Sequence, residues 1–132
     1  MNAAELLALP ARDLDAMVTT VVMRWAPGPY GTYRDVMKPG EQTGYHPTGD
    51  HLWPRFAPST DGQAMLAVLA QLHELFPHRY VQIVTPHVDA AGNCSPGEVN
   101  VWGYQNCCAR VPFATVAEMP QAVAVAAVLA ME

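Results

Sequence analysis

The sequence predicts an α+β protein in which a three-stranded antiparallel β-meander lies between helices, an α/β/α sandwich. Apolar residues recur with the helical period before residue 25, between residues 60 and 77, and after residue 120. Alternation with a period of two runs through residues 79–85, 98–104 and 110–115. The predicted order is therefore α, long loop, α, β, β, β, α, in a single domain that covers residues 1–132.

The first helix is predicted from one wide apolar face. Its members recur at spacings of three and four residues: Leu14, Met17, Val18, Val21 and Val22. Asp13 and Asp15 lie near its start, where carboxylates complement the helix dipole. We expect Pro27 and Gly28 to end the helix, and a short helical turn over residues 3–9 to precede it.

The second helix is predicted to begin near residue 60 with a capping box. In this motif Thr60 is the N-cap and Gln63 is the third helical residue. Five apolar residues supply the buried face: Met65, Val68, Leu69, Leu72 and Phe76. Pro77 is expected to end the helix.

The three predicted strands carry large apolar residues on both faces. In residues 79–85, Val81 and Ile83 alternate with Tyr80 and Val84, so we expect helices to cover both faces of the sheet. Pro112 lies in the third strand and cannot donate a ladder hydrogen bond, which predicts an edge strand. Residues 86–97, between the first two strands, are rich in turn-forming residues and are predicted as a turn.

The final helix is predicted to begin near Pro120, which suits a first helical turn. Residues 123–131 are apolar almost all round, so this helix is expected to be buried on more than one side.

Composition limits the classes of function. The chain is 51% hydrophobic and only 14% charged, and this low charged fraction favours a homo-oligomer. Its net charge of −5 disfavours general nucleic-acid binding. No apolar run approaches the roughly 20 residues that cross a bilayer, and no secretory signal is evident. An odd count of three cysteines suits a reducing cytoplasm, where we expect the protein to act without a cofactor.

Residues 26–57 form the predicted long loop, and this loop is the leading candidate for binding. Ten of its 32 residues are proline or glycine, and it also holds three of the seven basic residues. The candidate ligand- or partner-binding residues are Tyr30, Tyr33, Arg34, Lys38, Tyr45, Trp53 and Arg55. Aromatic faces beside arginine suit base stacking or a protein hot spot. The alternative is that the aromatic side chains only anchor the loop to the core.

His46, Asp50 and His51 are the nearest approach to a metal site, because imidazole and carboxylate are ligands of divalent metals. Their spacing matches no established pattern, and the alternative is a set of turn residues. Cys94 is expected at the opposite end of the sheet from Cys107 and Cys108, which argues against a disulfide or a shared metal. No catalytic residues are predicted, since no nucleophile motif or phosphate-binding loop is present.

Three segments resemble the phage ABA sandwich domain family, a largely uncharacterised group of bacteriophage and prophage proteins. They are LLALPARDLDAMVTTVVMRW (residues 6–25), FAPSTD (residues 56–61) and the alanine-rich residues 121–131. The sequence departs from the family at Arg24, where a glycine is usual, and no counterpart of residues 26–57 can be placed. The resemblance implies a phage origin and an antiparallel sheet between helices, and it carries no catalytic residues to this chain.

Together these features lead us to expect a non-enzymatic phage accessory protein that binds a host component in the cytoplasm of an infected bacterium. Such binding would counter an antiviral defence of the host. One alternative is a sponge that sequesters a small cyclic nucleotide immune signal. Another alternative is a metal-dependent enzyme that uses His46, Asp50 and His51.

Overall fold

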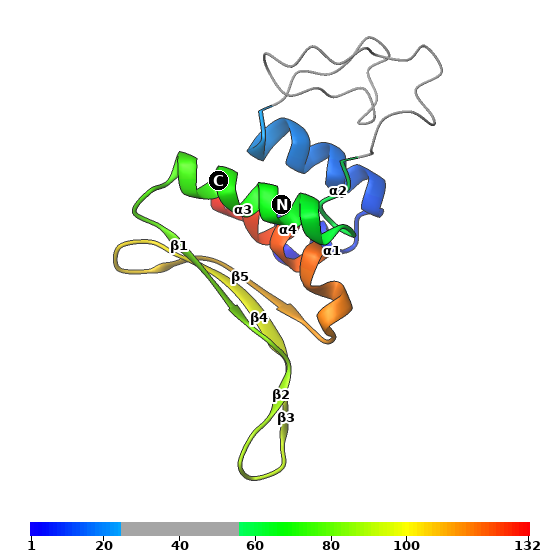
Figure 1. Ribbon diagram of the computed structural model, residues 1–132, viewed down its shortest axis with the longest axis vertical. Coiled ribbons are helices and arrows are strands. Elements are labelled where there is room, and N and C mark those ends of the chain that lie inside the picture. The colour runs from blue at the N-terminus through cyan, green and yellow to red at the C-terminus, as the bar shows by residue number, and fades with distance from the viewer. Residues whose placement is uncertain (25–55) are drawn as a thin grey trace.

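The helices from both ends of the chain pack together in the structure, a computed structural model that describes residues 1–24 and 56–132. These residues form helices and a three-stranded antiparallel sheet, so the predicted α+β class is confirmed. Figure 1 shows the helices on one side of the sheet and a narrow hairpin that extends from its end.

Two helices and a π-helical turn make up the first described segment. The short helix α1 (Ala3–Leu7) is capped by Asn2, whose side-chain oxygen accepts a hydrogen bond from the Glu5 amide at 2.8 Å. The helix α2 (Ala11–Met17) starts directly after Pro10 and continues as the π-helical turn η1 (Val18–Val22). Arg24 then adopts a left-handed conformation, with a φ of 59°, which ends the helical run.

The predicted apolar face of this helical run is confirmed in its centre. Leu14, Val18 and Val22 are fully buried and recur every four residues. Asp15 differs from the prediction, because this carboxylate does not serve only to complement the helix start. It is 1% exposed, and its Oδ1 atom accepts a hydrogen bond from the Ser59 amide at 2.9 Å. Asp15 therefore ties α2 to the segment that leads into the next helix.

The helix α3 (Gly62–Leu75) begins one residue later than the predicted capping box requires. Asp61, not Thr60, is the N-cap, and its Oδ1 atom accepts a hydrogen bond from the Gln63 amide at 3.0 Å. The Thr60 hydroxyl instead lies 3.5 Å from the Ala57 carbonyl oxygen. The predicted buried face is confirmed by Val68 and Leu72, which lie in the core.

The sheet has the predicted meander order. The strands β1 (Tyr80–Val84), β4 (Gly97–Trp102) and β5 (Cys107–Phe113) pair antiparallel in the order β1-β4-β5. Pro112 lies opposite Glu98 on β5, which is an edge strand, so this prediction is confirmed. A register shift between Val101 and Trp102 places one extra residue in β5 at that point.

Residues 86–97 are more ordered than the predicted turn. They contain a second, two-stranded sheet in which β2 (His87–Val88) pairs with β3 (Cys94–Ser95). The Asp89 carboxylate closes its tip by accepting hydrogen bonds from the Ala91 and Asn93 amides, each at 2.9 Å. Strands of two residues are too short to show a period in the sequence, which explains why this hairpin was not predicted.

The helix α4 (Met119–Ala130) lies at the centre of the core, and Pro120 is in its first turn as predicted. All seven residues from Ala122 to Val128 are buried, which confirms burial on more than one side. α4 packs on β4 and β5 on one side, and on α1, α2, η1 and α3 on the others. The order of layers in the described residues is therefore sheet, α4, outer helices.

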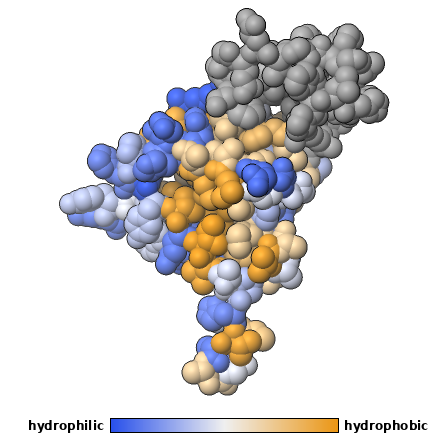
Figure 2. Space-filling view, viewed as in Figure 1, coloured by the Kyte–Doolittle hydropathy of each residue, from blue (hydrophilic) through white to orange (hydrophobic). Residues whose placement is uncertain are grey.

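This arrangement corrects the predicted position of the sheet between helices. The helices of the described residues cover only one face of the sheet, and the other face carries exposed residues such as Tyr80, Gln82 and Arg110. Large side chains on both strand faces do not require helices on both faces, because Tyr80 and Trp102 pair with each other across the strands on the open face. Even the covered face is incomplete over β1, where Val81 and Ile83 stay half-buried. Figure 2 shows apolar side chains gathered across the middle of this view.

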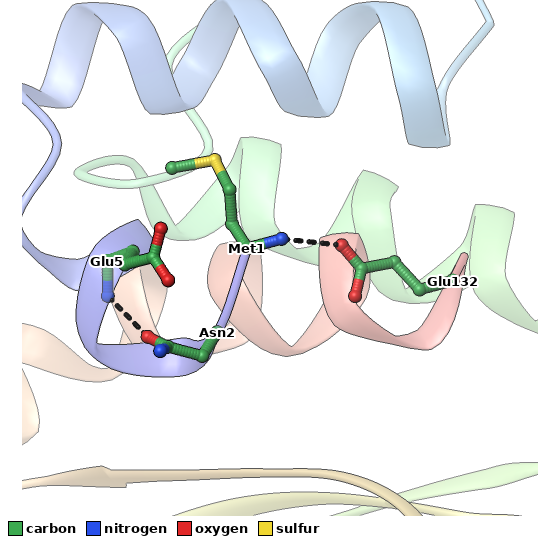
Figure 3. A network of polar contacts seen from close by, with 4 residues as sticks. All are labelled: Met1, Asn2, Glu5 and Glu132. Atoms are coloured by element: carbon green, nitrogen blue, oxygen red, sulfur yellow. Dashed lines mark hydrogen bonds and ion pairs between the residues drawn. The ribbon is translucent and has the colours of Figure 1, made fainter.

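The described ends of the chain meet at the surface. The Met1 ammonium group lies 3.3 Å from the Glu132 Oε1 atom, next to the Asn2 cap of α1 (Figure 3). Both side chains are exposed, so this ion pair adds little to stability. None of the helices in residues 1–24 and 56–132 has the length and apolar character to cross a bilayer.

Arg79 joins the turn after α3 to the end of α4. Its Nη1 atom donates a hydrogen bond to the Ala130 carbonyl at 2.9 Å, and its guanidinium lies 4.1 Å from the centre of the Phe76 ring. We expect Arg79→Ala to lower the free energy of unfolding by about 1–2 kcal/mol, since it removes the cation at a helix C-terminus and the ring contact. Urea denaturation would measure the loss.

Arg79→Lys is the matched control for this substitution. It keeps the positive charge near α4 but cannot stack its planar group on Phe76, so we expect an intermediate loss. If Arg79→Ala unfolds at the same urea concentration as the wild type, Arg79 does not hold the end of α4.

Candidate binding surface

The site residues predicted from the sequence lie outside the described residues. The candidate binding residues there are Tyr30, Tyr33, Arg34, Lys38, Tyr45, Trp53 and Arg55. The candidate metal ligands there are His46, Asp50 and His51. The contacts, burial and distances described below are those of residues 1–24 and 56–132.

The histidines in these ranges are scattered. His73 and His78 are exposed on and after α3, and His87 is exposed on β2. Its Nδ1 atom lies 3.0 Å from the Thr85 carbonyl oxygen. Within the described parts of the chain, no three His, Cys, Asp or Glu residues come close enough to hold a metal ion.

The three cysteines are free thiols at two ends of the sheet. Cys94 is exposed on β3, which precedes the start of β4. Cys107 lies opposite Trp102 at the other end of β4, and Cys108 follows it. This separation agrees with the prediction that Cys94 shares no disulfide with the adjacent pair.

A shallow hollow of about 250 Å³ opens between the starts of three helical segments. It is lined by Ala11, Ser59, Thr60, Ala117, Glu118 and Gln121. Glu118 places a carboxylate on its rim and accepts a hydrogen bond from the Thr115 hydroxyl at 3.0 Å. The Ser59 hydroxyl is buried and has no hydrogen-bond partner in the described residues. The carboxylate on the rim opposes the binding of an anion at these helix starts.

The strongest candidate is the open face of the sheet, which we call the outer face. Antiparallel register places its side chains in rows across the strands. One row consists of Gln82, Asn100 and Arg110, and a neighbouring row pairs Tyr80 with Trp102. The row on the other side holds Val84, Glu98 and Pro112.

A network of hydrogen bonds links side chains of the outer face across all three strands. Gln82 Oε1 accepts from Trp102 Nε1 at 3.0 Å and from Asn100 Nδ2 at 3.4 Å. Asn100 Nδ2 also donates to Glu98 Oε2 at 3.2 Å. On the other side of the network, Arg110 Nε donates to Asn100 Oδ1 at 3.3 Å.

Asn100 is the centre of this network. It is 3% exposed although it lies on the open face, because neighbouring side chains cover it. Its amide nitrogen faces two oxygen acceptors and its oxygen faces the Arg110 donor, so a flipped amide would lose all three hydrogen bonds. The network therefore holds the outer face in one arrangement.

The exposed part of the outer face combines aromatic, amide and cationic groups. Tyr80 is 60% exposed, Trp102 is half-buried, and Gln82 and Arg110 are exposed. Tyrosine, tryptophan and arginine are the residues most enriched at the energetic centres of protein interfaces.

Sequence reasoning missed this surface, although part of the signal was present. The alternation of Tyr80, Gln82 and Val84 with Val81 and Ile83 separates the two faces of β1 correctly. Pattern alone could not show which face would stay open, since both carry large side chains. The additional signal is the polar residue that each strand contributes to one row: Gln82, Asn100 and Arg110.

The chain was compared with protein-family models, with curated proteins and with solved structures, and nothing matches it.

Proposed function

We propose that this protein is a non-enzymatic binding protein and that its outer face contacts a partner protein. The observation that carries the proposal is the exposed Tyr80 beside Trp102, in register with the polar row that includes Arg110. An open sheet face of three strands suits a protein partner, whereas small ligands prefer concave sites.

The preformed network on the outer face supports this proposal. Side chains that are already fixed lose little conformational entropy on binding, which favours affinity. Trp102 and Gln82 are fixed by their mutual hydrogen bond, and Arg110 is fixed by Asn100. The partner would therefore meet a surface that needs little rearrangement.

The resemblance of three segments to phage ABA sandwich proteins supports the choice of partner. We propose a host component, bound in the cytoplasm of an infected bacterium to counter an antiviral defence. Self-association is part of the same proposal, because the open face and the edge strand β5 are both available to a second copy. The nucleotide sponge and the metal-dependent enzyme depend on residues outside the described ranges, so no described contact favours them.

Site-specific cross-linking tests the proposal. A photoreactive phenylalanine analogue replaces Tyr80, and the protein is irradiated in a lysate of the bacterial host. We expect one adduct of discrete mass, which excess unlabelled protein competes away. Because Tyr80 is 60% exposed, the substitution should leave the fold intact.

Tyr104 is the matched control, since it is 91% exposed in the turn between β4 and β5. The same analogue at position 104 should give no adduct of that mass. Identical adducts from both positions, or none from position 80, would contradict a specific contact through the outer face.

A further inference from the structure

Arg110 is held on the outer face by a neutral group. Its Nε atom donates to the Asn100 amide oxygen at 3.3 Å. Among the side chains that the structure describes, no carboxylate lies within 4.0 Å of the guanidinium. The charge of Arg110 is therefore held in position without a carboxylate partner among the described residues.

The free end of this guanidinium has a defined chemistry. Asn100 occupies the Nε side, which leaves the edge formed by the two terminal nitrogens open. Two parallel N–H groups on that edge match the two oxygens of a carboxylate. Asn100 is itself fixed by Gln82 and Glu98, so the whole row directs the open edge of Arg110.

Neighbouring groups decide which kind of oxyanion fits. Arg110 is the only cation among the outer-face residues of β1, β4 and β5, and Glu98 lies on the same face. A nucleic acid needs several cations along its backbone. A single carboxylate needs one cation. Tyr80 and Trp102 in the adjacent row would accept an apolar side chain next to it.

We propose that the partner contacts the outer face through an acidic protein segment, in which one carboxylate pairs with the terminal nitrogens of Arg110. An apolar side chain of the same segment lies against Tyr80 and Trp102. Asn100 is the positioning residue for Arg110. This inference rests on the proposed function, since it names the chemistry of the partner for the same surface.

The test uses a library of random peptides, selected on the wild-type protein. We expect the selected peptides to share an aspartate or glutamate at one position beside an apolar residue. Arg110→Gln should weaken their binding at least tenfold, and so should replacement of the shared acid by its amide. The two changes combined should cost little more than either alone, since they remove the same contact.

Arg24→Gln is the matched control, because it removes the same charge from an exposed arginine that lies in another part of the described structure. It should leave peptide binding unchanged. Arg110→Gln should keep the wild-type melting temperature, since the side chain is exposed and the glutamine amide nitrogen takes the position of the Nε atom that donates to Asn100.

The outcomes separate the inference from the proposed function. The selected peptides could need Tyr80 for binding, share no acidic residue, and bind the Arg110→Gln variant as well as the wild type. That result would overturn the inference of an acidic partner, while the outer face would remain a binding surface. Peptides whose binding is unaffected by Tyr80→Ala and by Arg110→Gln would overturn both. A parallel titration uses a single-stranded oligonucleotide. If the oligonucleotide binds through Arg110 and acidic peptides do not, the inference that the partner is a protein is overturned.

Discussion

Gly97→Ala is expected to lower the free energy of unfolding by about 3 kcal/mol and the melting temperature by about 10 °C. Gly97 begins β4, where a Cβ atom would lie 2.5 Å from Cζ of Phe113 and 2.8 Å from the Val84 carbonyl oxygen. The Phe113 ring is buried in the core and the Val84 oxygen belongs to β1, so neither can move away cheaply. Thermal unfolding followed by circular dichroism would measure the effect.

Gly62→Ala provides the matched control. Gly62 is the first residue of α3, and no atom lies within 4 Å of the position its Cβ would take. Alanine also favours the helix, so the melting temperature should stay the same or rise slightly. Equal melting temperatures for Gly97→Ala and Gly62→Ala would show that Phe113 does not pack against Gly97.

Val125→Asp is expected to abolish folding. Val125 is fully buried in α4, and the cost of an unpaired buried carboxylate is comparable to the whole stability of a small domain, roughly 5–15 kcal/mol. The far-ultraviolet circular dichroism of the variant should lack the wild-type helical signal. The same substitution at Val116, which is 60% exposed in the turn η3 (Val116–Glu118), should leave the fold unchanged.

Val125→Ala makes the same test without unfolding the chain. Removal of two buried methyl groups should cost about 2 kcal/mol, and urea denaturation would measure it. A loss no larger than that of Val116→Ala would show that α4 is not the centre of the core.

Much of the fold could be predicted because its signals are local. The apolar face of α2 and η1, the edge position of Pro112 and the first turn at Pro120 each depend on residues close in sequence. The α3 cap was placed one residue early, because Thr60 and Asp61 are both good capping residues and only the backbone conformation distinguishes them.

The features that were missed depend on contacts distant in sequence. Asp15 looks like an ordinary carboxylate at a helix start, yet it is bonded to Ser59, 44 residues away. The outer face was missed for a similar reason, since α4 covers only one side of the sheet and no local pattern reports that choice. The long aromatic loop therefore gives the stronger signal in the sequence, while the row of Gln82, Asn100 and Arg110 is brought together only by strand pairing.

The central position of α4 has a consequence for synthesis of the protein. Every other layer of the described structure packs on this helix, and yet it is the last element along the chain. While the ribosome is still translating residues 119–130, the earlier helices and the sheet lack the surface that joins them. A nascent chain from which α4 has not yet emerged therefore leaves exposed the apolar residues of the sheet and outer helices that α4 covers.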